Sequence, residues 1–322
     1  MDITFEEFNR AAFTLYGGNP VLRRHGASPL VADPSVLTPA ESGDGLWHLA
    51  CHTIFGIELY TSADGYSWEL SGRPVRRAMR ADLKYIGGTY YLYYEHLFPF
   101  VKKLVTTFFG GWHSDIYLTK SADLRHWTKP QRVLSNAMPY AADSRGRAAS
   151  NPFLLLEDGG KCSLYFSAGQ TYLNDCGFCE PTVISRADAA SPDGPFTALP
   201  EALLSPAPDE RWRNLCCGCI KVYRLKDAYI GIQNGIYRAE DGTSRSAIVL
   251  LRSSDGKTFR YVKDLLTPRE CPDAKDPYWM KQFVYASSLT LYDGKLRLYF
   301  NARNRADVLR GRENIGLYTA DL

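Results

Sequence analysis

The chain has 322 residues, a net charge of +3 and 23% charged residues, so it lacks the strong basic field typical of nucleic-acid-binding proteins. No apolar run approaches the roughly 20 residues of a membrane span, and the acidic start MDITFEEFNRAAF lacks the pattern of a secretion signal. We therefore expect a cytoplasmic protein without nucleic-acid or membrane partners, whose eight cysteines are thiols or metal ligands rather than disulfides.

Two kinds of segment alternate along the chain. The first is an apolar strand, a turn that often carries glycine, and an aromatic-rich strand; the second is a strand that ends in a polar turn with Asp, followed by an aromatic residue. Copies of the first kind begin at DPSVL (33–37), ADLKYIGG (81–88), NPFLLLEDGG (151–160), CIKVYRLKD (219–227) and SSLTLYDG (287–294). Copies of the second kind are residues 57–70, 116–130, 183–199, 248–262 and the truncated 315–322.

Five such copies, spaced by about 50 to 70 residues, predict an all-β fold: a five-bladed β-propeller with four-stranded antiparallel blades around a central channel. The alternative is a β-sandwich or two all-β domains. We expect one domain over residues 1–322. Because the last copy stops after its third strand, we expect residues 13–16 to supply the missing outer strand and to close the ring.

One face of such a propeller collects the start of every innermost strand and the loop between every second and third strand. The five strand starts are expected near Asp33, Arg80, Asn151, Cys217–Cys219 and Ala286. This register is set by counting back eight residues from Gly88, Gly159 and Gly294; the fourth blade lacks such a glycine. The middle loops begin near His52, Glu95–His96, Gln170, Gln233 and Asn301. The loops of the second and fifth blades are long, and long loops on one face of a rigid scaffold often carry function.

The segments NPVL…VADPSVL, GTYYLYY and SPDGPFTAL resemble glycoside hydrolase family 43, and the blade order resembles the wider group that includes families 32, 117 and 130. The resemblance implies three carboxylates in the channel: an Asp base in blade one, an Asp in blade three that tunes the acid, and a Glu acid in blade four. Asp33 matches the base, acting as base or nucleophile. Asn151 replaces the second carboxylate, and the stretch CCGCI (216–220) replaces the third.

A hydrolase needs a second carboxyl or an equivalent acid near the glycosidic bond. Glu180 and His96, both in middle loops, are the leading candidates for catalysis, and family 117 is thought to use a histidine. His113 and Asp115 are weaker candidates. Glu270 lies in RECPD, which is similar to the ECP acid motif of family 32, but it precedes the fifth blade's innermost strand and is expected in a loop.

Substrate contacts are expected from Arg80, Asn151, Glu95, Trp112 and Arg303. Trp112 follows two glycines in a long loop and is the candidate for stacking on a sugar. Arg303 belongs to an arginine-rich loop that could grip an anionic group. The sequence favours an exo-acting glycoside hydrolase for a short oligosaccharide or furanoside. The alternatives are an inverting phosphorylase, in which the arginines hold phosphate, and a non-catalytic carbohydrate-binding propeller.

The cysteines form two clusters on the predicted cavity face. Cys176 and Cys179 make a C-x-x-C pair in the third blade's loop, and Cys217 and Cys219 belong to a C-C-x-C run in the fourth blade. Four thiolates from two such clusters could hold a tetrahedral zinc ion, which makes zinc the one candidate cofactor. Three thiolates with Glu180 are a second ligand set. The alternative is that the cysteines are small buried packing residues.

Overall fold

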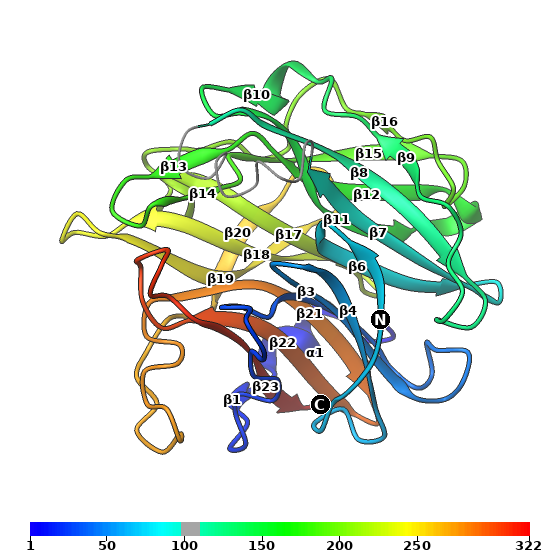
Figure 1. Cartoon of the computed structure of the whole chain (residues 1–322), viewed down its shortest axis with the longest axis horizontal. Coiled ribbons are helices and arrows are strands. Elements are labelled where there is room, and N and C mark those ends of the chain that lie inside the picture. The colour runs from blue at the N-terminus through cyan, green and yellow to red at the C-terminus, as the bar shows by residue number, and fades with distance from the viewer. Residues whose placement is uncertain (98–109) are drawn as a thin grey trace.

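The structure is a computed structural model and describes residues 1–97 and 110–322. Its strands form the five antiparallel blades around a central channel that the repeats predict (Figure 1). Blade one consists of β2 (Ala32–Leu37), β3 (Trp47–Thr53), β4 (Gly56–Ser62) and β5 (Glu69–Arg76), and blade two of β6 (Ala78–Ile86), β7 (Thr89–Leu97), β8 (Trp112–Ser121) and β9 (Gln131–Leu134).

Blades three to five follow the same plan. Blade three consists of β11 (Gly146–Leu156), β12 (Cys162–Ala168), β15 (Val183–Ala189) and β16 (Thr197–Ala198), and blade four of β17 (Cys216–Arg224), β18 (Tyr229–Arg238), β19 (Ser244–Ser253) and β20 (Arg260–Leu266). Blade five consists of β21 (Phe283–Tyr292), β22 (Lys295–Arg303), β23 (Glu313–Asp321) and β1 (Thr14–Leu15). Outside the blades lie β10 (Ala142–Asp143), β13 (Thr171–Leu173), β14 (Phe178–Glu180), helix α1 (Phe5–Arg10), and the 3-10 helices Pro139–Ala141, Asp158–Gly160 and Arg211–Arg213.

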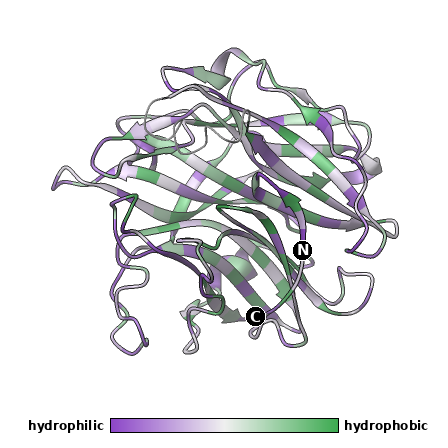
Figure 2. Ribbon diagram, viewed as in Figure 1, coloured by the Kyte–Doolittle hydropathy of each residue, from purple (hydrophilic) through white to green (hydrophobic). Residues whose placement is uncertain are grey.

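Buried hydrophobic residues of neighbouring blades pack into shared clusters. Leu59 and Leu92, for example, share one cluster between blades one and two. Figure 2 shows hydrophobic and hydrophilic residues interspersed along the strands. The outermost strand β5 is mostly exposed, whereas β3 is buried throughout. Packing of sheet against sheet therefore holds the ring, and each blade depends on two neighbours.

The N-terminal segment closes the ring, as predicted for residues 13–16. β1 pairs antiparallel with β23 and becomes the fourth strand of blade five, with Thr14 opposite Thr319. Asn19 extends this closure, because its side-chain amide donates to the carbonyl of Leu317 at 2.7 Å and accepts from the Leu317 N–H at 2.7 Å. The first and last strands of the chain are thus joined within one blade.

The innermost strand of every blade carries a β-bulge at the same place. The pairing register shifts at Ala32/Ser35, Met79/Asp82, Ser150/Phe153, Cys216/Cys219 and Val284/Ser287. In four blades the bulged residue has a positive φ: Asp33 (53°), Arg80 (54°), Asn151 (48°) and Gly218 (63°). Bulges re-aim side chains, and strained backbone of this kind clusters at functional sites. The predicted strand starts therefore coincide with these bulges.

Blades two and three are joined more closely than the repeats predict. β8 pairs in parallel with β11 over Trp112–Ser114 and Gly146–Ala148, so the two blades share one sheet. A Cβ at Gly146 would lie 2.1 Å from the carbonyl oxygen of Trp112, which explains the glycine. Trp112 therefore lies in a strand and not in the predicted loop; residues 98–109 of that loop lie outside the described part. None of the described helices is long and apolar enough to cross a membrane.

Candidate active site

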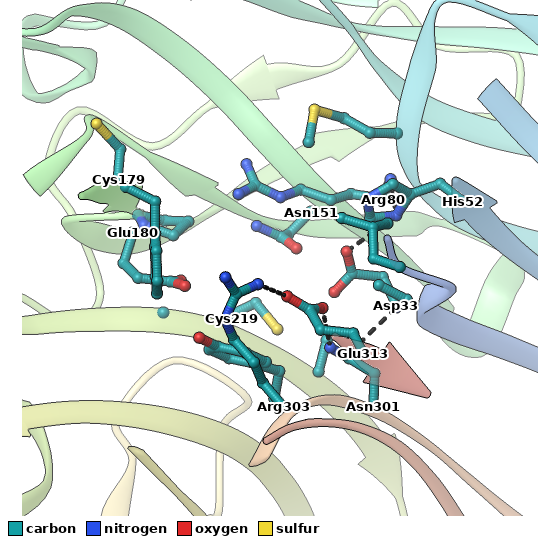
Figure 3. Close-up of a pocket in the computed structure, with 18 of the residues that line it drawn as sticks. Asp33, His52, Arg80, Asn151, Cys179, Glu180, Cys219, Asn301, Arg303 and Glu313 are labelled. Carbon is teal, nitrogen blue, oxygen red and sulfur yellow. Dashed lines mark hydrogen bonds and ion pairs between the residues drawn. The ribbon is translucent and has the colours of Figure 1, made fainter. Parts of the chain in front are cut away.

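A cavity of about 590 Å³ opens on the face where the bulged strands begin (Figure 3). Such a volume suits a small ligand. Its walls come from every blade. The charged and polar side chains that line it are Asp33, His52, Arg80, Asn151, Cys179, Glu180, Cys219, Asn234, Asn301, Arg303 and Glu313.

Asp33 enters the cavity from the bulge of β2. Its backbone N–H donates to Asn301 Oδ1 at 3.2 Å, and its Oδ2 lies 3.1 Å from Nδ1 of His52. Burial opposes ionisation of this carboxyl, but the hydrogen bond from His52 and the charge of Arg80 outweigh it and lower the pKa of Asp33. Its side chain keeps 16% of its surface open. Asp33 is therefore an ionised carboxylate that a ligand can reach.

Glu180 faces Asp33 from the other side of the cavity (Figure 3). It ends β14, which forms a short hairpin with β13, and it lies opposite Thr171. Burial raises the pKa of Glu180 to about 8; Arg80 opposes this rise, and the negative charges of Asp33 and Glu313 add to it. Glu180 therefore keeps its proton at neutral pH. The structure brings two of the three predicted catalytic residues, Asp33 and Glu180, into one cavity in opposite protonation states.

Arg80 reaches the cavity from the bulge of β6 and is held by a buried ion pair. Its Nη1 lies 2.9 Å from Oε2 of Glu95, which has no exposed surface. The other oxygen of Glu95 accepts from Nε1 of Trp112 at 3.2 Å. Glu95 thus contacts Arg80 rather than the cavity, so its predicted contact with substrate is replaced by a role in positioning Arg80.

Trp112 lines the cavity but offers little surface for stacking. Only 5% of it is exposed, because it packs against Met79, Leu97 and Ala148. Its Nε1 also lies 3.1 Å from Oγ of Ser114. The open sugar platform predicted at Trp112 is therefore absent, since pairing of β8 with β11 draws the residue into the sheet.

Blades three and four contribute no carboxyl group from their bulges. Asn151 lines the cavity and is buried, with Nδ2 3.4 Å from Oγ of Ser150. In blade four the bulged residue is Gly218, where a Cβ would lie 2.1 Å from the carbonyl oxygen of Asn234. Blade four therefore has no room for a side chain at this position, which gives a steric reason for the glycine in CCGCI.

Arg303 lines the cavity, but all three of its guanidinium nitrogens contact other groups of the protein. Nη1 lies 2.7 Å from Oε1 of Glu313, Nε donates to the carbonyl of Arg305 at 2.8 Å, and Nη2 donates to that of Asp307 at 2.8 Å. The other oxygen of Glu313 accepts from Asn301 at 2.9 Å. Arg303 thus organises the loop after β22. The other arginines of this loop do not line the cavity.

His96 is not brought to the cavity. It lies in β7, opposite Asp115 of β8, and its ring centroid is 5.0 Å from that of Tyr117. Burial lowers the pKa of His96. Alternation along β7 explains the placement, because neighbouring Glu95 occupies the side toward Arg80. Its predicted catalytic role is therefore not supported. Glu270 pairs with Lys281 at 2.7 Å and also lies outside the cavity lining.

The four cysteines predicted to bind zinc do not come together. Cys176 packs beside Cys216, whereas Cys217 packs in the core between blades three and four. Side chains alternate along a strand, so adjacent cysteines of β17 enter different cores. Among residues 1–97 and 110–322, no group of three or more His, Cys, Asp or Glu side chains is arranged to hold a metal ion.

The other two of these four cysteines, Cys179 and Cys219, border the cavity separately. Cys179 lines it beside Glu180, and Sγ of Cys219 donates to Oδ1 of Asn234 at 2.7 Å. Burial raises the pKa of the thiols of Cys217 and Cys219 to about 12, so both stay protonated at neutral pH. This arrangement does not fit the predicted zinc site and matches the alternative of small buried side chains.

Sequence reasoning did not select several residues of the site. His52 and Asn301 were placed where second strands end, but nothing in the sequence marked them as partners of Asp33. Glu313 was missed entirely. Its signal is its position opposite Arg303 in the β22–β23 pair, where opposite charges stabilise each other.

No family model and no curated protein matches this sequence. Solved structures match it over nearly the whole chain. A thermostable family-43 glycoside hydrolase is 14% identical with a TM-score of 0.65, covering 93% of this chain and 91% of its own. An exo-1,5-α-L-arabinanase from a bovine ruminal metagenomic library is 15% identical with a TM-score of 0.56, covering 89% and 92%.

A xylan β-1,4-xylosidase from Bacillus halodurans is 16% identical with a TM-score of 0.61, and the match covers 93% of this chain but 53% of that enzyme. At these identities the likeness concerns architecture. The chain therefore has the five-bladed propeller fold of the family-43 glycoside hydrolases, as its repeats and short motifs predict.

Proposed function

We propose that this protein is an exo-acting glycoside hydrolase for a short oligosaccharide or furanoside, with Asp33 as general base and Glu180 as general acid. One observation carries the proposal: two carboxyl groups face each other across a single cavity, and their surroundings push their pKa values apart. Pairs of carboxyl groups in opposite protonation states are the requirement of glycoside hydrolysis.

In the proposed reaction Glu180 donates its proton to the glycosidic oxygen as the bond to the anomeric carbon breaks. Asp33 accepts a proton from a water molecule whose oxygen attacks that carbon from the opposite face. The products are a free sugar and an alcohol. Glu180 leaves the step as a carboxylate and Asp33 as an acid, and solvent restores both. The nearby charge of Arg80 stabilises carboxylates on both sides of the cavity.

This assignment differs from the family pattern in the origin of the acid. The family takes its acid from the start of blade four, where this chain has the stretch CCGCI (216–220) with Gly218 at the bulge. Here the acid comes from the β13–β14 hairpin of blade three. The short hairpin is anchored to blade five, because the N–H of Val308 donates to the carbonyl of Cys176 at 3.0 Å. This contact supports Glu180 as a fixed group rather than a solvated loop residue.

The test is a screen of aryl α-L-arabinofuranosides, β-D-xylosides and related glycosides, with and without phosphate. These sugars are chosen because an arabinanase and a xylosidase share the fold. We expect turnover without phosphate, and a loss of at least a hundredfold in Asp33→Asn. Glu180→Gln should lose at least a hundredfold on alkyl glycosides, whose leaving alkoxides need the acid, and less on aryl glycosides, whose leaving phenolates are weaker bases. Turnover only with phosphate would indicate a phosphorylase. Sugar binding without turnover, unaffected by Asp33→Asn, would indicate a carbohydrate-binding propeller.

A further inference from the structure

The residues that line the cavity are divided by polarity between its interior and its mouth. Among the polar lining residues of the described chain, Asp33 and Arg80 are partly exposed and the others are buried. The apolar lining residues with substantial open surface form a set that we call the apolar rim. The apolar rim consists of Pro29, Leu30, Ile54, Phe178, Val308 and Leu309.

Leu309 is the most exposed member of the apolar rim, with 70% of its surface open. The loop holds it rigidly. Oδ1 of Asp307 accepts from the Leu309 N–H at 2.9 Å, and Nη1 of Arg312 donates to the Leu309 carbonyl at 2.9 Å. Arg303 fixes the same turn through the carbonyl of Asp307 at 2.8 Å. An ordered loop thus adds a leucine to the other apolar residues at the cavity mouth, and a contiguous apolar surface beside a cavity is the kind that marks a binding site.

The same loop, which follows β22, also contacts the hairpin on the opposite side of the cavity mouth. The N–H of Val308 donates to the carbonyl of Cys176, so the loop of blade five rests on the hairpin that carries Glu180. The guanidinium of Arg303 stacks over the ring of Phe178 in that hairpin, with Cζ of Arg303 5.1 Å from the centroid of the ring. The apolar rim is therefore continuous with the acid side of the cavity, where the leaving group of a glycoside would lie.

We propose that the apolar rim is a binding site for an apolar leaving group, so that the substrates are glycosides carrying an alkyl or aryl aglycone. This inference rests on the proposed function and narrows its substrate class from a short oligosaccharide or furanoside to a single sugar that carries an apolar aglycone. The buried polar groups suit the hydroxyls of one sugar. A second sugar at the rim would need hydrogen-bonding side chains, and the apolar rim supplies none.

The test compares methyl and hexyl glycosides of one sugar, whose leaving alcohols are similarly basic and differ mainly in apolar surface. We expect kcat/KM to favour the hexyl glycoside by at least tenfold. Leu309→Asn should reduce this preference by about fivefold. The matched control is Leu156→Asn, because Leu156 is also exposed, at 45%, but ends β11 and does not line the cavity.

Equal kcat/KM for the two glycosides, or an equal loss in Leu309→Asn and Leu156→Asn, would overturn the apolar rim as a leaving-group site. If no glycoside is turned over, the proposed function fails, and calorimetric binding of the same two glycosides to wild type and Leu309→Asn decides the inference separately. Tighter binding of the hexyl compound, reduced by Leu309→Asn, supports it; equal affinity or absent binding contradicts it.

Discussion

Nδ1 of His52 lies 3.1 Å from Oδ2 of Asp33 and 3.3 Å from the backbone nitrogen of Arg80. This one ring nitrogen lies between the bulges of blades one and two. Nδ1 cannot donate to Asp33 and accept from the Arg80 N–H at the same time; when it carries the proton it donates to the carboxylate, and this charge-assisted hydrogen bond is the contact that lowers the pKa of Asp33. His52 is a positioning residue: it sets the orientation and the ionisation of Asp33 without being the proposed base.

Replacing His52 by Ala should move the acidic limb of the pH–rate profile. The hydrogen bond from His52 helps to lower the pKa of Asp33, together with the charges of Arg80 and Lys221. Without it, the pKa of Asp33 rises, and because the base must be ionised, kcat/KM falls at a higher pH than in wild type. The measurement is kcat/KM from about pH 2.5 to 8 on the best substrate of the screen, because the lowered pKa of Asp33 puts the wild-type acidic limb below about pH 4.

His52→Gln should recover part of the shift, since an amide can still donate to Asp33. His126→Ala is the matched control, because His126 also contacts an Asp, at 2.7 Å, but is exposed. An acidic limb that stays in place in His52→Ala, with only a uniform loss of rate, would contradict the role assigned to His52.

The ionisation of Glu180 should set the alkaline limb of the pH–rate profile. It should also lower the free energy of unfolding as the pH rises from acidic toward alkaline values. The pKa of Glu180, about 8, means that the proposed acid loses its proton, and the enzyme its activity, above about pH 8. A carboxyl whose pKa is raised by folding stabilises the native state fully below its unfolded pKa, and this contribution is lost as the pH rises through the folded value. We expect Glu180→Gln to be more stable than wild type at pH 8, by a few kcal/mol.

The measurement is urea denaturation of both proteins at pH 4 and at pH 8. Gln has nearly the shape of Glu but does not ionise, so the stability difference between the proteins should grow with pH. A difference that is the same at both pH values would mean that Glu180 titrates normally. The prediction of an acid with a raised pKa would then be wrong.

The bulged ring was predictable, and the fate of the cysteines was not. Arg80, Asn151 and Ala286 each lie eight residues before a glycine turn, at Gly88, Gly159 and Gly294, and that spacing encodes strand register. Glu180 followed from its place in a middle loop. The cysteine pattern was misread because thiol spacing says nothing about which face of β17 each side chain occupies. Trp112 was misread because the pairing of β8 with β11 depends on contacts between blades that no local pattern encodes.

The ion pair between Arg80 and Glu95 should be a major determinant of stability. Glu95→Gln removes the carboxylate that pairs directly with the buried guanidinium of Arg80 and leaves only the more distant charge of Asp33, which should cost about 3 kcal/mol. The measurement is the free energy of unfolding in urea. Glu6→Gln is the control, because Glu6 and Arg10 form an exposed pair at 2.7 Å that should contribute at most about 0.5 kcal/mol. If both variants lose a similar free energy of unfolding, the guanidinium of Arg80 does not depend on Glu95 for its stability in the buried site.

Gly218→Glu tests whether blade four can recover the acid of the family pattern. Gly218 has a φ of 63°, and a Cβ there would lie 2.1 Å from the carbonyl oxygen and 2.6 Å from Nδ2 of Asn234. The variant should lose at least about 2–3 kcal/mol of stability, since both the backbone and the contact are strained. Gly242→Ala separates these effects, because its φ is 78° but nothing lies within 4 Å of its Cβ.

Gly242→Ala should therefore lose only about 1 kcal/mol, the part that a positive φ imposes on any residue with a Cβ. In a Glu180→Gln background, Gly218→Glu should not restore turnover, since the steric conflict keeps a carboxyl from being held at the bulge. Thermal denaturation and kcat on the same preparations decide both points. Recovered activity in the double variant would mean that a glutamate in blade four can act as the acid. It would also mean that Asn234 can move far enough to accommodate a Cβ at position 218.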